Sequence, residues 1–196
     1  MLAVDTKPKT YKDKVNQSIA FSGLTVDFFT QKKVKELSKY VKGKTILNVG
    51  CGVGLLDKHL APLAKRWVGI DIDRESIKEA SKNEGEYLWY DGVKIPAGKF
   101  DVILCINVLH HVESHLQQNL FREMAGHLDG VLICLEHNPW NPITRFIFKH
   151  SEIDKGCVML SAARVRSFMD FFDLKAKTIF HAFGTQTITF GRKNDK

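Results

Sequence analysis

Two hydrophobic patterns alternate along the chain. Short, nearly continuous apolar runs predict strands that are covered on both faces. Apolar residues spaced three and four positions apart predict amphipathic helices between these strands. The strand-like runs are 46–49, 67–72, 86–90, 100–107 and 130–135. The helical segments are 26–41, 55–65, 113–128 and 161–172.

The last part of the chain changes to a period of two. Alternating, β-branched segments at 174–180 and 187–192 flank a Phe183-Gly184 turn, which predicts a hairpin. Strands that alternate with helices and end in a hairpin predict an α/β protein. Its mostly parallel seven-stranded sheet would be flanked by helices and carry an antiparallel C-terminal strand. The 196 residues, 44% of them hydrophobic, suffice for a single domain with a sizeable core.

Three glycines stand on alternate positions where the first strand gives way to a helix. Gly50, Gly52 and Gly54 follow the run 46–49, and helical spacing begins at Leu55. Because glycine has no Cβ, the backbone of such a turn can come close to a ligand at the helix N-terminus. The turn therefore predicts a binding site.

The second strand ends in an acid about twenty residues after this turn. Asp71 can accept hydrogen bonds from both hydroxyls of a ribose, so the ligand is expected to contain a nucleoside. Asp73 has a different expected role, as the N-cap of the next helix, with Glu75 in its first turn.

With these features the chain resembles the class I S-adenosylmethionine-dependent methyltransferases of the small-molecule type. The resemblance implies a Rossmann-like methyltransferase fold and S-adenosyl-L-methionine as cofactor. A nicotinamide dehydrogenase is the alternative, but its turn more often reads Gly-x-Gly-x-x-Gly, and Leu55 stands where the third glycine would fall. The family's motifs occur here, in order, as Asn48-x-Gly50-x-Gly52-x-Gly54, Gly69-Ile70-Asp71, Tyr90-Asp91-Gly92, and Phe100-Asp101-Val102-Ile103 leading to Val108-Leu109-His110-His111-Val112.

The resemblance implies a role for each motif at the cofactor. The glycines would line the methionine end, Asp71 would hold the ribose and Asp91 the adenine amino group. A turn-forming Asp-Gly remains the alternative for Asp91. Asn48 stands where many relatives have an acid, and its uncharged amide predicts weaker cofactor binding. The residues expected to bind cofactor are Asn48, Gly50, Cys51, Gly52, Gly54, Asp71, Ile72, Asp91, Gly92 and Asn107.

Methyl transfer from a sulfonium needs alignment and exclusion of water, and a base only if the acceptor loses a proton. Candidates at the ends of the fourth and fifth strands are His110, His111, Glu136 and His137. Histidine suits the role because its pKa lies near working pH. The alternatives are support of the cofactor pocket for His110 and His111, and local pairing for Glu136 and His137. The expected catalytic pair is His111 with His137.

Motifs that the sequence lacks restrict the possible classes of methyl acceptor. The fourth strand is not followed by the Asn/Asp-Pro-Pro-aromatic motif of exocyclic amino methylation, nor does the chain have a Pro-Cys nucleophile, so nucleic acid is a disfavoured partner. A metal is disfavoured too. The resembled ubiquinone-pathway enzymes carry two glutamates and a histidine after this strand, whereas Asn107 and His110 stand at the glutamate positions and only His111 matches.

Charge and loops suggest the domain organisation. Residues 1–44 hold ten lysines against four acids, so +6 of the net +7 lies in the first quarter. We expect a basic arm at 1–25, of which residues 1 to about 16 are mobile or helical only when docked, and a cofactor-binding domain at 26–196. The irregular stretch 136–160 is expected to be a substrate loop or lid.

The acceptor is expected to be a small molecule, with two alternatives. One is an RNA or protein methyltransferase that uses a lysine stripe, and the other is a non-catalytic relative that only binds the cofactor. The stripe consists of Lys32, Lys35, Lys39 and Lys42. No apolar stretch reaches the roughly 20 residues of a membrane span, and the scattered cysteines predict reduced thiols, so a cytoplasmic protein is expected. The sequence does not indicate an oligomeric state.

Overall fold

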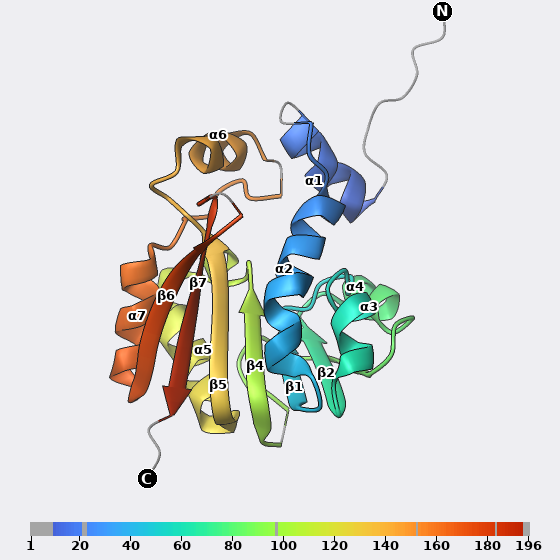
Figure 1. Ribbon diagram of the computed structural model, residues 1–196, viewed down its shortest axis with the longest axis vertical. Coiled ribbons are helices and arrows are strands. Elements are labelled where there is room, and N and C mark those ends of the chain that lie inside the picture. The colour runs from blue at the N-terminus through green and yellow to red at the C-terminus, as the bar shows by residue number, and fades with distance from the viewer. Residues whose placement is uncertain (1–9, 21–22, 97, 152, 183, 194–196) are drawn as a thin grey trace, which may run out of the picture.

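The computed structural model has one seven-stranded sheet in the part of the chain that it describes (Figure 1). The strands are β1 Thr45–Val49, β2 Arg66–Asp71, β3 Glu86–Trp89, β4 Phe100–Ile106, β5 Leu128–His137, β6 Leu174–His181 and β7 Gln186–Lys193. The described residues are 10–20, 23–96, 98–151, 153–182 and 184–193.

Helices connect these strands. They are α1 Tyr11–Ile19, α2 Val26–Val41, α3 Asp57–Leu60, α4 Arg74–Ala80, α5 Ser114–His127, α6 Pro142–His150 and α7 Ala162–Phe171, with short 3-10 turns at Ala61–Leu63 and Leu109–His111. None of the helices within the described ranges has both the length and the apolar character needed to cross a bilayer.

The strand order β3-β2-β1-β4-β5-β7-β6 confirms the predicted fold class. Strands β1 to β5 run parallel, and β7 is antiparallel to both of its neighbours. The chain order reverses between β1 and β4, which lie side by side at the centre. In open α/β sheets a ligand crevice forms at the carboxyl ends of the strands at such a reversal.

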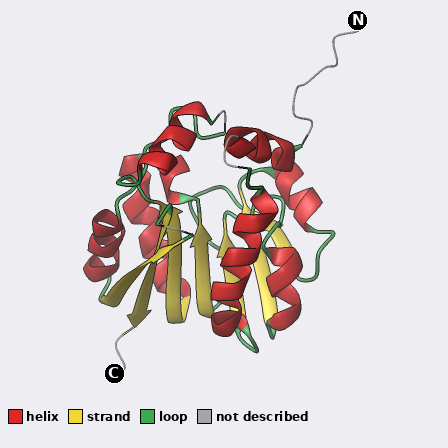
Figure 2. Ribbon diagram, turned by 45° about the horizontal axis from the view of Figure 1, so that its top comes forward, coloured by secondary structure: helices red, strands yellow, loops and turns green. Residues whose placement is uncertain are grey.

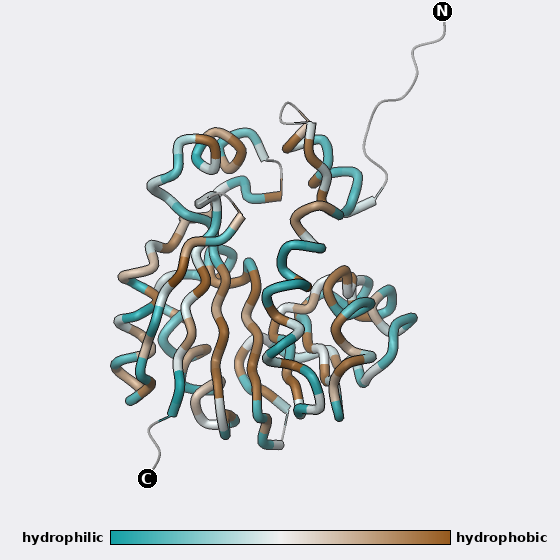
Figure 3. The backbone as a smooth tube through the Cα atoms, in the orientation of Figure 1, coloured by the Kyte–Doolittle hydropathy of each residue, from teal (hydrophilic) through white to brown (hydrophobic). Residues whose placement is uncertain are grey.

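Alternate residues of the central strands point to opposite faces of the sheet, so each face needs its own cover. In β4, Cys105 belongs to a core that includes Phe121 of α5. Leu104 belongs to a second core that includes Leu37 of α2 and Leu60 of α3. Helices therefore flank the sheet on both sides (Figure 2), and the apolar strands lie between more polar outer surfaces (Figure 3).

Several boundaries agree with the hydrophobic pattern. Helix α2 spans the predicted 26–41, Asp73 caps α4 by accepting a bond from the Ser76 backbone nitrogen, and Ser161 caps α7 in the same way through Arg164. The helix after the glycine turn is shorter than predicted, because α3 ends at Leu60 and a 3-10 turn containing Pro62 follows.

Two helices lie outside the helical segments that the hydrophobic pattern predicts. Helix α6 occupies part of 136–160, starting at an Asn141 cap with Pro142 in its first turn. Helix α1 occupies part of the basic arm and starts at a Thr10–Asp13 capping box. Both helices lie above the carboxyl ends of the central strands (Figure 1).

Candidate functional site

The glycine turn is tied to the end of β2 by three hydrogen bonds that its backbone nitrogens donate. The nitrogens of Gly50 and Cys51 donate to the Ile70 carbonyl at 2.8 and 3.0 Å. The nitrogen of Gly52 donates to Asp71 Oδ2 at 2.8 Å, while Oδ1 accepts from the Asp73 nitrogen at 2.9 Å. Each oxygen of the ionised carboxylate keeps a lone pair for a further donor.

The three glycines are needed for different reasons. All have positive φ, but a Cβ on Gly50 would collide with Val108, and a Cβ on Gly54 would collide with Asn83 beside α4. At Gly52, with φ of +56°, no described atom lies within 4 Å of where a Cβ would be. Gly50 and Gly54 therefore permit packing, whereas Gly52 leaves an open space at the turn.

A buried polar group supports the turn from below. Asn48 Nδ2 donates to Asp57 Oδ1 at 2.7 Å, and Trp67 Nε1 donates to Oδ2 at 3.0 Å. Burial raises the pKa of Asp57 to about 6, although these bonds favour the ionised form. The Asn48 side chain is thus fixed by an acid on α3.

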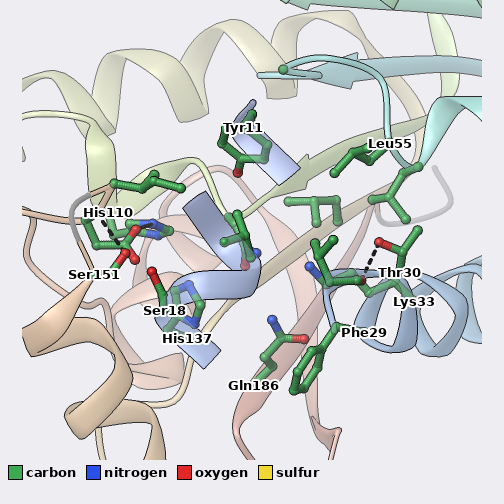
Figure 4. A pocket seen from close by; sticks show the side chains of 18 of the residues that line it. Tyr11, Ser18, Phe29, Thr30, Lys33, Leu55, His110, His137, Ser151 and Gln186 are labelled. Carbon is green, nitrogen blue, oxygen red and sulfur yellow. Dashed lines mark hydrogen bonds and ion pairs between the residues drawn. The ribbon is translucent and has the colours of Figure 1, made fainter. Parts of the chain in front are cut away.

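A cavity of about 210 Å³ opens beside the turn, at the carboxyl ends of β1, β4 and β5. Figure 4 shows side chains from separate elements gathered around it, including Tyr11 of α1, Lys33 of α2 and His137 of β5. Ile147 of α6 also lines the wall. Helices α1 and α6 therefore cover this end of the sheet.

Asn107 places an unused acceptor at the cavity. Its backbone has φ of 57° and donates from its nitrogen to the Leu135 carbonyl at 2.8 Å. Its buried Oδ1 has no hydrogen-bond partner within the described part of the chain. Buried polar atoms are nearly always paired, so this acceptor at the cavity is available to a donor on a bound ligand.

The side chains of one histidine, His110, and two acids, Glu136 and Asp154, interact at the other end of the cavity. His110 Nδ1 lies 2.6 Å from Glu136 Oε2, and His110 Nε2 lies 3.3 Å from Asp154 Oδ1. Burial opposes a charge on His110, but Asp154 and Glu136 outweigh it and raise the pKa of the ring above its usual range. The charge on His110 in turn helps to keep the pKa of Asp154 low.

The two histidines of the expected catalytic pair are neutral. Burial and the neighbouring His110 charge lower the pKa of His137 to about 4, and both causes also lower the pKa of His111. His111 Nδ1 lies 3.1 Å from Cys157 Sγ, and its Nε2 lies 3.7 Å from Asp154 Oδ1. Both rings keep a lone pair that can accept a proton.

Lys33 brings an amine to the same cavity. Burial lowers the pKa of Lys33 to about 8, against the opposing effect of the Glu136 charge. Figure 4 shows Lys33 and His110 at opposite ends of the group of labelled side chains. The cavity therefore presents cationic, neutral and acidic groups within one enclosure.

The structure divides the predicted site residues between the cavity and its surroundings. Those that line the cavity are Asn48, Gly50, Cys51, Gly52, Asn107, His111 and His137. The remaining predicted residues, which do not line it, are Gly54, Asp71, Ile72, Asp91 and Gly92. Asp91 is exposed, and its Oδ1 accepts from the nitrogens of Val93 and Lys94 at 2.8 and 3.0 Å, which is the geometry of a turn.

Sequence reasoning missed Lys33, Asp154 and Gln186, which also line the cavity. Lys33 lies four residues after Phe29, which places it on the inner side of α2, so helical spacing could have identified it. Asp154 follows α6 and Gln186 begins β7, and no motif or periodicity distinguishes either one.

Comparison with known proteins gives matches in sequence. Residues 46–130 match the family model described as a methyltransferase domain. The chain is 33% identical over 128 residues to ribosomal protein L11 methyltransferase of Thermotoga maritima, covering 61% of this chain and 47% of that protein. It is 36% identical over 110 residues to ubiquinone biosynthesis O-methyltransferase of Psychrobacter cryohalolentis, covering 50% and 43%. The chain thus spans less than half the length of these curated relatives.

Solved structures share the fold over most of the chain. One is magnesium protoporphyrin IX methyltransferase from Synechocystis with bound SAH, at a TM-score of 0.72 and 19% identity. The superposition covers 92% of this chain and 87% of that one. The segment 46–130 matched by the family model contains the glycine turn, Asp71 and Asn107.

Proposed function

We propose that the chain, whose residues 46–130 match a methyltransferase domain, is a class I S-adenosylmethionine-dependent methyltransferase that transfers a methyl group from S-adenosyl-L-methionine to a small-molecule acceptor. The observation that carries this proposal is the 2.8 Å bond between the Gly52 nitrogen and Asp71 Oδ2. It joins the open side of the glycine turn to the acid at the end of β2, which are the two parts a sulfonium nucleoside requires.

The residues beside the turn fit that cofactor. The space at Gly52 admits close approach of a ligand, and the orphaned Asn107 Oδ1 matches an amino group, which is a donor. Asn48 directs its Nδ2 toward Asp57, and this nitrogen is a donor that cannot accept from an amino group, whereas Asn107 presents an acceptor. We therefore assign the methionine amino group to Asn107, and the ribose hydroxyls to Asp71.

The adenine end would lie outside the cavity, over the edge formed by Ile72, Asp91 and Gly92. Ile72 is 63% exposed, and a Cβ on Gly92 would touch its side chain, so these two residues adjoin each other. Asp91 uses Oδ1 to hold its own turn, which leaves Oδ2 for the adenine amino group.

When bound, S-adenosyl-L-methionine supplies a methyl carbon that an acceptor atom attacks from the side opposite sulfur. The described residues would align the acceptor with the methyl carbon and exclude water from both. Tyr11 and Ile19 of α1 and Ile147 of α6 line the enclosure in which acceptor and cofactor would meet. A cavity of about 210 Å³ suits the reacting end of a small acceptor.

His111 and His137 would take a proton if the acceptor must lose one. Both are neutral at working pH because burial and the charge of His110 lower their pKa values. A base of this kind typically contributes 10²- to 10⁴-fold in rate. Lys33 and Gln186 at the same cavity would orient a polar or anionic acceptor.

The test uses the full chain, methyl-labelled cofactor and a cell extract separated into small molecules, RNA and protein. We expect labelled product in the small-molecule fraction, and its loss with Asp71→Ala. Absence of label from all three fractions would contradict an enzymatic function and leave a cofactor-binding protein.

An RNA or protein acceptor is the second candidate, and one observation favours it. Lys32, Lys35 and Lys39 of α2 line a shallow depression with Phe180 and His181 of β6. Label that appears only in the RNA or protein fraction, and that disappears with Lys35→Glu, would support this candidate and reject the small-molecule acceptor. RNA binding through these lysines must also weaken with salt.

A further inference from the structure

We propose that His110, His137 and Asp154 bind one divalent transition-metal ion, with zinc the best match, at the acceptor end of the cavity. One nitrogen of each ring and one carboxylate oxygen all lie within 4.8 Å of one another. All three residues line the cavity. The set unites the 3-10 turn after β4, the end of β5 and the segment after α6.

An orphaned atom points at the ion independently of this clustering. The His110 side chain is 1% exposed, and its Nε2 has no hydrogen-bond partner among the residues described. Asp154 Oδ1 is 3.3 Å away without the geometry of a hydrogen bond. A buried ring nitrogen that makes no hydrogen bond beside a carboxylate oxygen leaves both atoms available to a shared ligand.

Glu136 prepares His110 for this role. Its Oε1 accepts from the backbone nitrogens of Val108 and Leu109 at 3.1 and 2.8 Å, and its Oε2 lies 2.6 Å from His110 Nδ1. A carboxylate that accepts at both oxygens requires the proton on Nδ1. The second proton of the charged ring lies on Nε2, and a metal ion that displaces this proton would meet a lone pair directed toward Asp154. Metal-binding histidines have this arrangement, in which a carboxylate fixes the tautomer and the ring.

The spacing suits a tetrahedral ion. With zinc–nitrogen and zinc–oxygen bonds of about 2.0–2.2 Å, two ligand atoms of a tetrahedral site lie about 3.4 Å apart. His110 Nε2 and Asp154 Oδ1 are 3.3 Å apart. Because all the ligand atoms lie within 4.8 Å of one another, the pairs that include His137 need to shorten by at most about 1.4 Å to reach this spacing.

Ligand chemistry selects the class of ion. Two imidazoles and one carboxylate favour zinc and related transition metals, whereas magnesium and calcium prefer oxygen ligands. Three protein ligands also leave the fourth position of the ion open, as at catalytic zinc sites. This position would face the cavity, so an acceptor oxygen could occupy it, a consequence that rests on the function proposed above.

The proposal departs from the sequence-based expectation that metal is disfavoured. That expectation compared only the positions after the fourth strand, where His111 alone matched. The set proposed here takes its other ligands from 137 and 154, which folding brings to His110. With His137 bound to the ion, His111 remains as the histidine that could accept a proton.

The test titrates zinc chloride into the chelator-treated full chain at pH 7.5, by calorimetry, without cofactor or acceptor. We expect one equivalent to bind with a micromolar or lower Kd and to raise the Tm. His137→Gln and Asp154→Asn should each weaken binding at least tenfold, and Glu136→Gln should weaken it 10- to 100-fold. His59→Gln, which changes an exposed histidine on α3, is the matched control and should leave binding unchanged.

Cobalt substitution adds a readout that surface binding does not give, because tetrahedral cobalt has intense visible absorption. Circular dichroism of each variant shows whether a loss of binding reflects unfolding. No zinc binding by the folded wild type, or wild-type affinity for zinc in both His137→Gln and Asp154→Asn, would overturn the proposal and leave a buried ion pair of His110 with two carboxylates. Neither result affects methyl transfer, which is measured separately.

Discussion

The Asp71 carboxylate accepts a hydrogen bond from the Gly52 backbone nitrogen at 2.8 Å. The bond connects the end of β2 to the turn that follows β1, and it joins two residues that are 19 positions apart in the chain. It places the acid beside the open space at Gly52 before any ligand arrives. The turn is therefore preorganised, which lowers the ordering cost of binding.

Gly52→Ala should remove cofactor binding while costing only backbone strain. At Gly52 and at Gly43 the φ values are +56° and +70°, and no described atom lies within 4 Å of an added Cβ at either position. Both alanine variants should lose about 1–2 kcal/mol of stability. Only Gly52→Ala should weaken S-adenosylhomocysteine binding, by tenfold or more in calorimetry. Equal affinity in the two variants would contradict the assignment of Gly52 to the ligand.

Lys33→Met should stabilise the ligand-free protein. The pKa of Lys33 falls from 10.5 to about 8 on folding because burial opposes the charge. At pH 7 the amine is charged in both states and the folded protein bears the penalty, so the variant should be more stable by about 1–3 kcal/mol. As pH rises from 8 to 10.5, folded Lys33 is neutral and this advantage should disappear.

Urea unfolding from pH 7 to 10.5 measures the effect, with Lys35→Met, an exposed lysine on the same helix, as control. Surface substitutions usually change stability by less than about 0.5 kcal/mol. If Lys33→Met is no more stable than Lys35→Met at pH 7, burial does not penalise the charge of Lys33 in solution.

Asp57→Asn should remove one pH-dependent part of the stability. Burial raises the pKa of Asp57 from 3.8 to about 6, so the folded protein binds a proton that the unfolded chain has released between these values. Stability from this group is greatest below pH 4 and falls as pH rises to 6. The difference in unfolding free energy between wild type and variant should shrink by about 2–3 kcal/mol over that range.

The variant also places an amide between two donors, Asn48 Nδ2 and Trp67 Nε1. Loss of one acceptor costs about 1–3 kcal/mol at every pH, which lowers the whole curve without changing its slope. Denaturant titrations at pH 4, 5, 6 and 7 separate the two effects. A difference that stays constant with pH would exclude Asp57 as the titrating group.

Much of the fold could be predicted because hydrophobic periodicity determines which face of each element is buried. The run around Leu104 reads as a strand covered on both faces, and the spacing in 26–41 gives the bounds of α2. Helix α6 was missed because its nine residues begin with Pro142, follow Pro139 closely, and mix apolar with basic residues. Short helices of this kind depend on tertiary contacts, such as the Thr144 Oγ1 bond to the Thr185 carbonyl.

Some residues of the candidate site could likewise be placed from sequence, and others could not. Gly52 and Asp71 could be brought together from sequence, because adjacent parallel strands end at the same edge of the sheet. Asp154 could not, since its position depends on how the segment after α6 folds back to His110. Asn107 was expected at the cofactor, but its unpaired oxygen and positive φ are properties that only coordinates reveal.

Calorimetric titration of S-adenosylhomocysteine into wild type, Asp71→Ala and Asp73→Ala tests the central claim most directly. Asp73→Ala is the control because it removes a carboxylate two residues away that caps α4. Binding to wild type, at least tenfold weaker binding to folded Asp71→Ala (about 1.4 kcal/mol), and unchanged binding to Asp73→Ala is the predicted result. Wild-type affinity in Asp71→Ala would contradict the claim that this acid and the glycine turn form one nucleoside site.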